Sequence, residues 1–217
     1  MTSTLATEPA RDVVLVHGIF DTSWALDRLN AALTSAGFRT HPLDFGINDG
    51  RDQLEELATA VCTKVEGSVP AGARYSIVGF SMGGLIGRYY AQRLADRSRI
   101  DALVTIGTPH RGTWLAYIYG PTAANQMRPN SDFLRDLETD GESCREFRWI
   151  TISTPIDLMV LPWTSCQLPW AVNHVFRVIF HPLLIFDKRV IHQVVESLSS
   201  RSPELTFDPS PAPVDGA

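Results

Sequence analysis

The sequence predicts an α/β fold, with an open, mostly parallel sheet of about six strands and helices on both faces. Short apolar runs alternate with amphipathic segments along most of the chain, which is typical of a parallel sheet covered by helices. One of these runs passes through a glycine-rich turn directly into a helical pattern. The chain has 217 residues, 44% of them hydrophobic, which suits a single domain with a sizeable core.

The predicted elements alternate regularly in the first half of the chain. The valine-rich run at 12–16 is typical of a strand buried on both faces, and Gly37 stands where the first helix should end. Strands are predicted at 12–16, 39–45 and 75–78, and helices at 24–36, at 52–66 and after Ser81.

The second half adds three strands, a final helix and one long segment without a strand pattern. Strands are predicted at 100–107, 148–153 and 171–180, and an amphipathic helix at 190–198. Residues 113–147 are expected to form a cap-like insertion, small enough that the fold carries only a minimal cap. The predicted domain therefore covers residues 12–200, with 1–11 as a disordered lead and the Pro- and Ser-rich residues 201–217 as a flexible tail.

Residues 79–83 read Gly-Phe-Ser-Met-Gly and join a predicted strand to a predicted helix. In that context Gly-x-Ser-x-Gly indicates a nucleophile elbow, a tight turn that raises one hydroxyl above the edge of a sheet. Gly79 and Gly83 have a steric reason to be there, because the turn leaves no room for a β-carbon on either side of the serine. Ser81 is therefore the candidate nucleophile.

A second loop at the same predicted sheet edge offers backbone donors for an oxyanion. The first strand runs into His17-Gly18, a setting that usually supplies one N–H of an oxyanion hole, while the residue after the nucleophile supplies the other. We assign these two N–H groups to Ile19 and Met82, with Phe20 as the alternative to Ile19. His17 is interpreted as structural, its ring bonded to loop backbone.

Position along the chain selects the acid and the base. Where a sheet carries such an elbow, the triad follows the order Ser, acid, His, with each member beyond the carboxyl end of a strand. Asp157 follows the strand at 148–153, and His181 follows the strand predicted at 171–180. Asp187 is the rival acid, although it comes after the histidine. The other candidates fit less well: His110 precedes these acids, His174 falls in a strand, His192 falls in a helix, and Asp132, Asp136 and Asp140 fall in the cap-like segment.

Six segments together resemble the small α/β-hydrolase-fold lipases and esterases of the triacylglycerol-lipase type. They read VHGIF, VGFSMGGLIGRYYA, TIGTPHRGTWLA, MRPNSDFL, STPIDLMV and HPLLIFDKRV, and the likeness runs over residues 12–198. The resemblance implies that Ser81, Asp157 and His181 are nucleophile, acid and base. One departure is that Phe180 stands where a glycine often precedes the catalytic histidine.

The expected function is that of a serine carboxylic-ester hydrolase that cleaves acyl esters or lipids through an acyl-enzyme. This chemistry needs neither a metal nor an organic cofactor. Two alternatives stay open. The same triad could run acyl transfer or thioester cleavage, and the chain could be an inactive binding protein on a hydrolase fold.

Apolar residues beside the predicted site are candidates for a substrate pocket or a lipid-facing rim. They lie in the loop after the first strand, in the cap-like segment and in the apolar loop 158–170. Two internal prolines and several polar residues make a membrane span at 158–186 improbable, and shallow contact with a membrane surface stays open. The candidate pocket residues are Phe20, Trp114, Tyr117, Leu158 and Trp163.

Charge and composition exclude other classes of function. A net charge of −5 gives no basic patch for nucleic acid. No secretory signal precedes the domain, so we expect a cytoplasmic protein, and export of a trimmed form remains open. Cys62, Cys144 and Cys166 are interpreted as free thiols, with a Cys144–Cys166 bridge as the alternative for an exported protein.

Overall fold

The six predicted strands form one parallel sheet. The computed structural model describes residues 11–19, 23–45, 49–118, 120, 122–140 and 146–200. The strand order is β2-β1-β3-β4-β5-β6, and each neighbouring pair is parallel. The strands are β1 (Asp12–Val16), β2 (Arg39–Leu43), β3 (Tyr75–Phe80), β4 (Ile100–Ile106), β5 (Arg148–Ser153) and β6 (Val172–Val175).

The strand order reverses between β1 and β3, which makes this position the switch point of the sheet. From β1 the chain steps outward to β2 and then returns to β3 on the other side of β1. In open parallel sheets a ligand binds at such a switch point, beyond the carboxyl ends of the strands. Val16 pairs with Gly79, so the loop after β1 and the elbow after β3 leave the sheet side by side.

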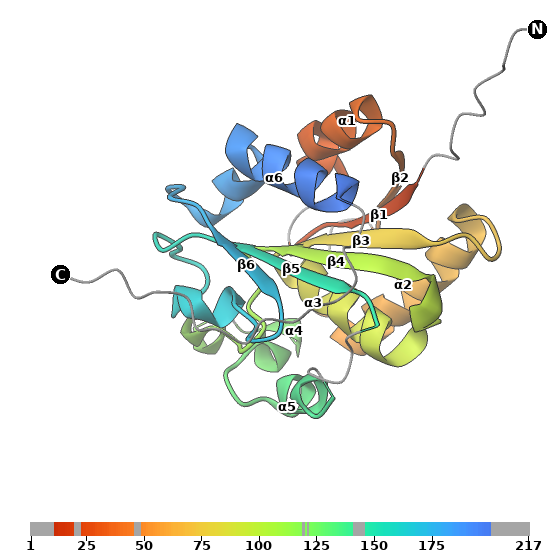
Figure 1. The fold of residues 1–217 in the computed structure, drawn as a ribbon. Coiled ribbons are helices and arrows are strands. Elements are labelled where there is room, and N and C mark those ends of the chain that lie inside the picture. The colour runs from red at the N-terminus through yellow and green to blue at the C-terminus, as the bar shows by residue number, and fades with distance from the viewer. Residues whose placement is uncertain are drawn as a thin grey trace, which may run out of the picture.

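Helices cover both faces of this sheet (Figure 1). α1 (Asp27–Ser35) and α6 (Lys188–Ser199) lie on one face, and α2 (Leu54–Ser68) and α3 (Met82–Tyr89) lie on the other. Alternate strand residues enter two buried apolar clusters, one against each helical layer; Val14 and Ile77 pack toward α2 and α3, whereas Val13 and Val78 pack toward α1 and α6. The four central strands β1, β3, β4 and β5 are therefore buried on both faces, whereas the edge strands β2 and β6 are partly exposed.

The described part of the cap-like segment contains short helices and no strand. These are η4 (Trp114–Tyr117), α4 (Thr122–Gln126) and α5 (Asp132–Glu138), and in Figure 1 α4 and α5 lie beyond α3, on the face away from α6. Arg88 of α3 fastens this segment to the domain, because its Nη2 donates to Leu137 O at 2.9 Å and to Glu138 Oε1 at 3.0 Å. This guanidinium is fully buried, and Glu138 supplies its counter-charge.

Two predicted elements differ from the structure. The predicted helix at 24–36 begins as a 3₁₀ turn, η1 (Ser23–Leu26), before α1. The strand predicted at 171–180 ends at Val175, because the chain then leaves the sheet and forms hydrogen bonds with the side chain of Thr154. The Thr154 hydroxyl donates to Val178 O at 2.8 Å and accepts from Val178 N at 3.2 Å. Residues 176–180 therefore form a loop rather than the second half of a strand.

None of the described helices combines the length and apolarity needed to cross a bilayer. The thiols of Cys62 and Cys166 are free. Cys144, which the alternative disulfide would require, lies outside the described residues.

Candidate active site

The turn after β3 holds Ser81 in a backbone conformation that non-glycine residues rarely adopt. Its φ is 54° and its ψ is −123°, and such strain is characteristic of functional turns. Ser81 N donates to Ile106 O at 2.8 Å and Gly84 N donates to Ser81 O at 3.0 Å, which ties the turn to β4 and to the first turn of α3. The side chain is half-buried.

Three glycines let α3 begin this close to the sheet. A β-carbon on Gly79 would lie 2.5 Å from Gly84 Cα. A β-carbon on Gly83 would overlap the carbonyl oxygen of His17, and one on Gly84 would overlap the hydroxyl of Thr108. The sequence Gly-x-Ser-x-Gly-Gly is therefore required by packing against two neighbouring loops, as well as by the turn itself.

Asp157 and His181 form a buried hydrogen-bonded pair. His181 Nδ1 lies 2.7 Å from Asp157 Oδ2. The other carboxylate oxygen, Oδ1, accepts from the N–H groups of Met159 at 2.8 Å and Val160 at 2.9 Å. A carboxylate can only accept hydrogen bonds, so we assign the proton of the His181–Asp157 hydrogen bond to His181 Nδ1.

The second ring nitrogen of His181 is left free by this arrangement. Within the described residues, His181 Nε2 is buried and has no hydrogen-bond partner. The ring packs against Phe80 with 5.0 Å between the ring centroids, and Phe80 directly precedes Ser81. A β-carbon on Gly107 would lie 2.7 Å from His181 Cε1. The imidazole is thus positioned at the carboxyl end of the sheet, with an unused acceptor nitrogen.

The backbone donors assigned to an oxyanion lie beside Ser81. A β-carbon on Gly18 would be 3.2 Å from Ser81 Cβ, so the loop that contains Ile19 runs against the nucleophile candidate. Ile19 and Ser81 line the same pocket, and Met82 is the first residue of α3. Phe20, the alternative donor and a candidate pocket residue, lies outside the described residues.

His17 fixes the loop after β1. Its fully buried ring contacts Gly18 O through Nδ1 at 3.0 Å and accepts from Phe45 N through Nε2 at 3.4 Å. These contacts agree with the structural interpretation, since both ring nitrogens are occupied by backbone.

Most of the other candidate acids and bases have structural partners. Asp187 caps α6 by accepting from Arg189 N at 2.8 Å, and the Arg189 guanidinium lowers the pKa of this carboxyl. His110 is fully buried with Nε2 2.9 Å from Thr105 Oγ1, and burial lowers its pKa well below the usual value. His174 lies in β6 and His192 in α6; Asp132, Asp136 and Asp140 pair with arginines of the surface.

A small apolar pocket of about 100 Å³ opens beside Ser81. Its walls come from the cap-like segment and from the loop after Asp157, and its polar surface is small. The lining residues are Ile19, Ser81, Pro109, Thr113, Leu115, Ala116, Ala124, Met127, Met159 and Val160.

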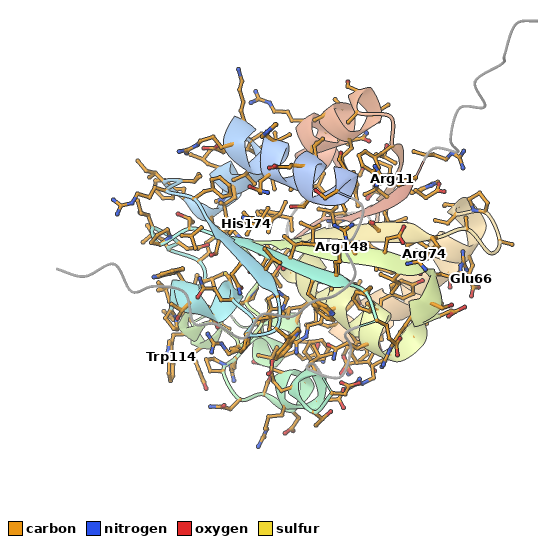
Figure 2. The ribbon with its side chains drawn as sticks, viewed as in Figure 1. Arg11, Glu66, Arg74, Trp114, Arg148 and His174 are labelled. Atoms are coloured by element: carbon orange, nitrogen blue, oxygen red, sulfur yellow. The ribbon has the colours of Figure 1, made fainter. Side chains whose placement is uncertain are left out.

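The pocket is formed largely by the segments that the sequence predicts, but different residues of those segments line it. Trp114 and Tyr117 stack on each other at 5.5 Å and are exposed, while Leu115 and Ala116 of the same helical turn face inward. Figure 2 shows Trp114 at the outer surface, on the side of the molecule opposite Arg11 and Arg74, which directly precede β1 and β3. Leu158 is likewise exposed and Trp163 is half-buried, and this small pocket is lined by none of the predicted residues Trp114, Tyr117, Leu158 and Trp163.

The parallel six-stranded sheet, the strained serine at the strand-to-helix turn and the buried Asp-His pair define the chain as a protein of the α/β-hydrolase fold. The sequence profile of the palmitoyl protein thioesterase family matches residues 12–137, more than half of the chain. The chain belongs to this family.

Individual proteins are similar to this chain at low sequence identity, two of them by their solved structures. The mature form of Bacillus licheniformis lipase BlEst2 is 17% identical with a TM-score of 0.69, and the match covers 91% of this chain and 95% of the lipase. Aspergillus fumigatus lipase B is 18% identical with a TM-score of 0.70, over 89% of this chain and 54% of that one. The rice esterase PIR7B is 24% identical over 144 residues, so the matched region spans 63% of this chain and about half (50%) of the esterase.

Proposed function

We propose that this protein is a serine hydrolase that cleaves acyl esters or thioesters, with Ser81 as nucleophile, His181 as general base and Asp157 as its orienting acid. The observation that carries the proposal is the 2.7 Å bond between His181 Nδ1 and Asp157 Oδ2. It leaves Nε2 as a buried acceptor with no partner among the described residues, at the sheet edge that carries Ser81. A base needs such a free acceptor to take a proton from a hydroxyl, and Ser81 Oγ is not hydrogen-bonded to it in this structure.

The reaction proceeds through two half-reactions. Ser81 Oγ attacks the acyl carbonyl carbon while His181 Nε2 takes its proton, and the N–H groups of Ile19 and Met82 stabilise the oxyanion. The imidazolium then gives the proton to the departing alcohol or thiol. Water, activated by the same nitrogen, attacks the acyl-enzyme and releases a carboxylic acid and free Ser81.

Family membership favours thioesters among the substrates. The matching family is described as palmitoyl protein thioesterase, whereas the relatives reported above are named as esterase and lipases. Both reactions transfer an acyl group to the same serine, so we propose that the acyl moiety, held in the apolar pocket, is the common recognition element.

Exposed apolar side chains around the pocket support shallow contact with a lipid surface. Trp114, Tyr117 and Leu158 flank the pocket segments and are exposed, and apolar patches beside a site commonly mark such contact. In a vesicle-sedimentation assay, Trp114→Ser and Leu158→Ser should each release protein from neutral phosphatidylcholine vesicles without changing hydrolysis of a soluble acetate ester. Unchanged sedimentation of both variants would contradict the lipid contact.

The function is tested by steady-state hydrolysis of p-nitrophenyl esters and of acyl-coenzyme A thioesters. Ser81→Ala and His181→Ala should each lower kcat/KM by roughly three or more orders of magnitude, with circular dichroism unchanged. Including an added alcohol measures acyl transfer, which should stay the minor product. Absence of turnover by the folded wild-type protein on every substrate would reject the proposal in favour of a binding protein.

A further inference from the structure

We propose that Thr113 is a positioning residue for the catalytic acid, acting through one peptide group of the loop that follows Asp157. The inference rests on the proposed function, because it concerns the orientation of Asp157 toward His181. It assigns a role to the last residue of the segment Pro-His-Arg-Gly-Thr at 109–113, which lies within the lipase-like stretch TIGTPHRGTWLA.

The Thr113 hydroxyl is fully engaged. It donates to Met159 O at 2.8 Å, accepts from Leu161 N at 3.0 Å and accepts from Leu115 N at 3.3 Å. A hydroxyl has one proton and two lone pairs, so every hydrogen-bonding position of this oxygen is used. The side chain is 6% exposed. A surface threonine that serves only as a helix cap needs just the third of these bonds.

A single peptide plane connects this hydroxyl to the carboxylate of Asp157. The C=O of Met159 and the N–H of Val160 belong to the same rigid peptide group and point in opposite directions. The carbonyl oxygen of Met159 accepts a hydrogen bond from the Thr113 hydroxyl, and the N–H of Val160 donates to Asp157 Oδ1 at 2.9 Å. Orienting the carbonyl therefore orients the N–H, and the two bonds polarise each other in the same direction.

The other oxygen of the Asp157 carboxylate, Oδ2, binds the imidazole of His181. Asp157 Oδ2 binds His181 Nδ1 at 2.7 Å, while Oδ1 is fixed by Met159 N and Val160 N. A carboxylate turns as one unit, so loss of the Val160 N bond, which leaves Oδ1 held by Met159 N alone, loosens the orientation of Oδ2 toward the imidazole. The chain of contacts thus runs from Thr113 through the 159–160 peptide and Asp157 to His181.

Backbone hydrogen bonds still join the loop at 111–114 to the loop at 157–165 when the Thr113 hydroxyl alone is removed. Trp114 N donates to Leu161 O at 2.9 Å, and Arg111 N donates to Ser165 O at 3.2 Å. Valine keeps the branched shape of threonine in the pocket wall. Thr113→Val therefore removes the orienting bond with the loops still joined, and Thr113→Ser keeps that bond while it loses a methyl group.

The test compares Thr113→Val, Thr113→Ser and Ser165→Ala with the wild type. Ser165 Oγ donates to Gly112 O between the same two loops, but this bond does not act on the 159–160 peptide, so Ser165→Ala controls for loosened loops. We expect Thr113→Val to lower kcat about tenfold, the order expected for one lost hydrogen bond, with KM within about twofold of wild type. Thr113→Ser and Ser165→Ala should keep kcat within about twofold.

The low-field proton NMR signal of His181 Nδ1–H supplies a readout that does not require turnover. It should be present in the wild type, Thr113→Ser and Ser165→Ala, and shifted upfield or lost in Thr113→Val. An unchanged signal and kcat in Thr113→Val, or equal losses in Thr113→Ser, would overturn the inference. An inactive wild type would refute the proposed function instead, and the proton signal would still decide the role of Thr113.

Discussion

The size of the pocket beside Ser81 predicts a preference for short acyl chains, which a single substitution should extend. The pocket volume is about 100 Å³, the volume of roughly three water molecules at about 30 Å³ each. A methylene group is close to a water molecule in size. With the carbonyl carbon at Ser81, the pocket therefore accommodates an acyl chain of roughly four carbons, and kcat/KM of the wild type should be highest for butanoyl esters.

Met127 closes one wall of this pocket and is 8% exposed. Met127→Ala removes three heavy atoms, which makes room for about three further methylene groups. Each buried methylene contributes about 0.8 kcal/mol, so three contribute up to about 2.4 kcal/mol, or about 60-fold in kcat/KM. The maximum should move from butanoyl toward heptanoyl or octanoyl esters.

The assay is kcat/KM for p-nitrophenyl esters from acetate to palmitate. Leu134→Ala is the matched control, since Leu134 is a buried apolar residue of the same cap-like segment that does not line the pocket. Both variants should lose about 2–5 kcal/mol of stability from the cavity they create, but only Met127→Ala should change the chain-length profile. A wild-type maximum at palmitate, or the same profile in Met127→Ala and wild type, would refute the assignment of the pocket.

Three further predictions concern Phe180, His110 and Gly107. Phe180 has φ 72°, so Phe180→Gly should relieve strain and raise the free energy of unfolding by about 1 kcal/mol in urea titrations; a decrease would show that its side chain contributes more than the strain costs. Because burial lowers the pKa of His110, the unfolded chain binds a proton there that the folded chain does not, and stability should fall below about pH 6.5, by at most about 1.4 kcal/mol per pH unit. His110→Gln should remove that part of the slope between pH 7.5 and 5.5, and an identical slope would contradict it. Gly107→Ala places a methyl group 2.7 Å from His181 Cε1 and should cost about 100-fold in kcat by displacing the imidazole; near-normal turnover would contradict the placement of His181.

The strands and the elbow could be predicted because their causes are local. Valine-rich runs buried on both faces and two glycines that flank a serine leave few alternative structures. Asp157 could be found because it follows a strand that ends where its sequence predicts, at Ser153. The strands, the elbow and the position of Asp157 can be predicted from the residues next to them in the sequence.

The sequence argument that selects His181 as the candidate base is only partly correct. The strand predicted to precede it ends at Val175, and the intervening apolar residues Ile179 and Phe180 are exposed in a loop. In a sequence, exposed apolar residues in a loop cannot be told apart from the last residues of a buried strand. The residue types are the same, although their exposure differs. The resemblance to lipases points to the same histidine independently.

The pocket and the role of Thr113 could not be read from the sequence. The phase of the short helical turn η4 decides that Leu115 faces the pocket and Trp114 faces solvent, and one turn is too short for a periodic pattern. The Thr113 hydroxyl meets Met159 O from 46 positions away in the chain. Such a contact depends on how two loops pack, which local composition does not determine.

The measurement that tests the central claim most directly is the site of covalent labelling by a fluorophosphonate probe. Intact-mass spectrometry of the wild type should show one adduct, peptide mapping should locate it on Ser81, and Ser81→Ala should stay unlabelled. Asp157→Asn should label much more slowly than the wild type, since it leaves the imidazole in the wrong tautomer. A folded wild-type protein that forms no adduct, or one labelled at another residue, would contradict the assignment of Ser81 as the nucleophile.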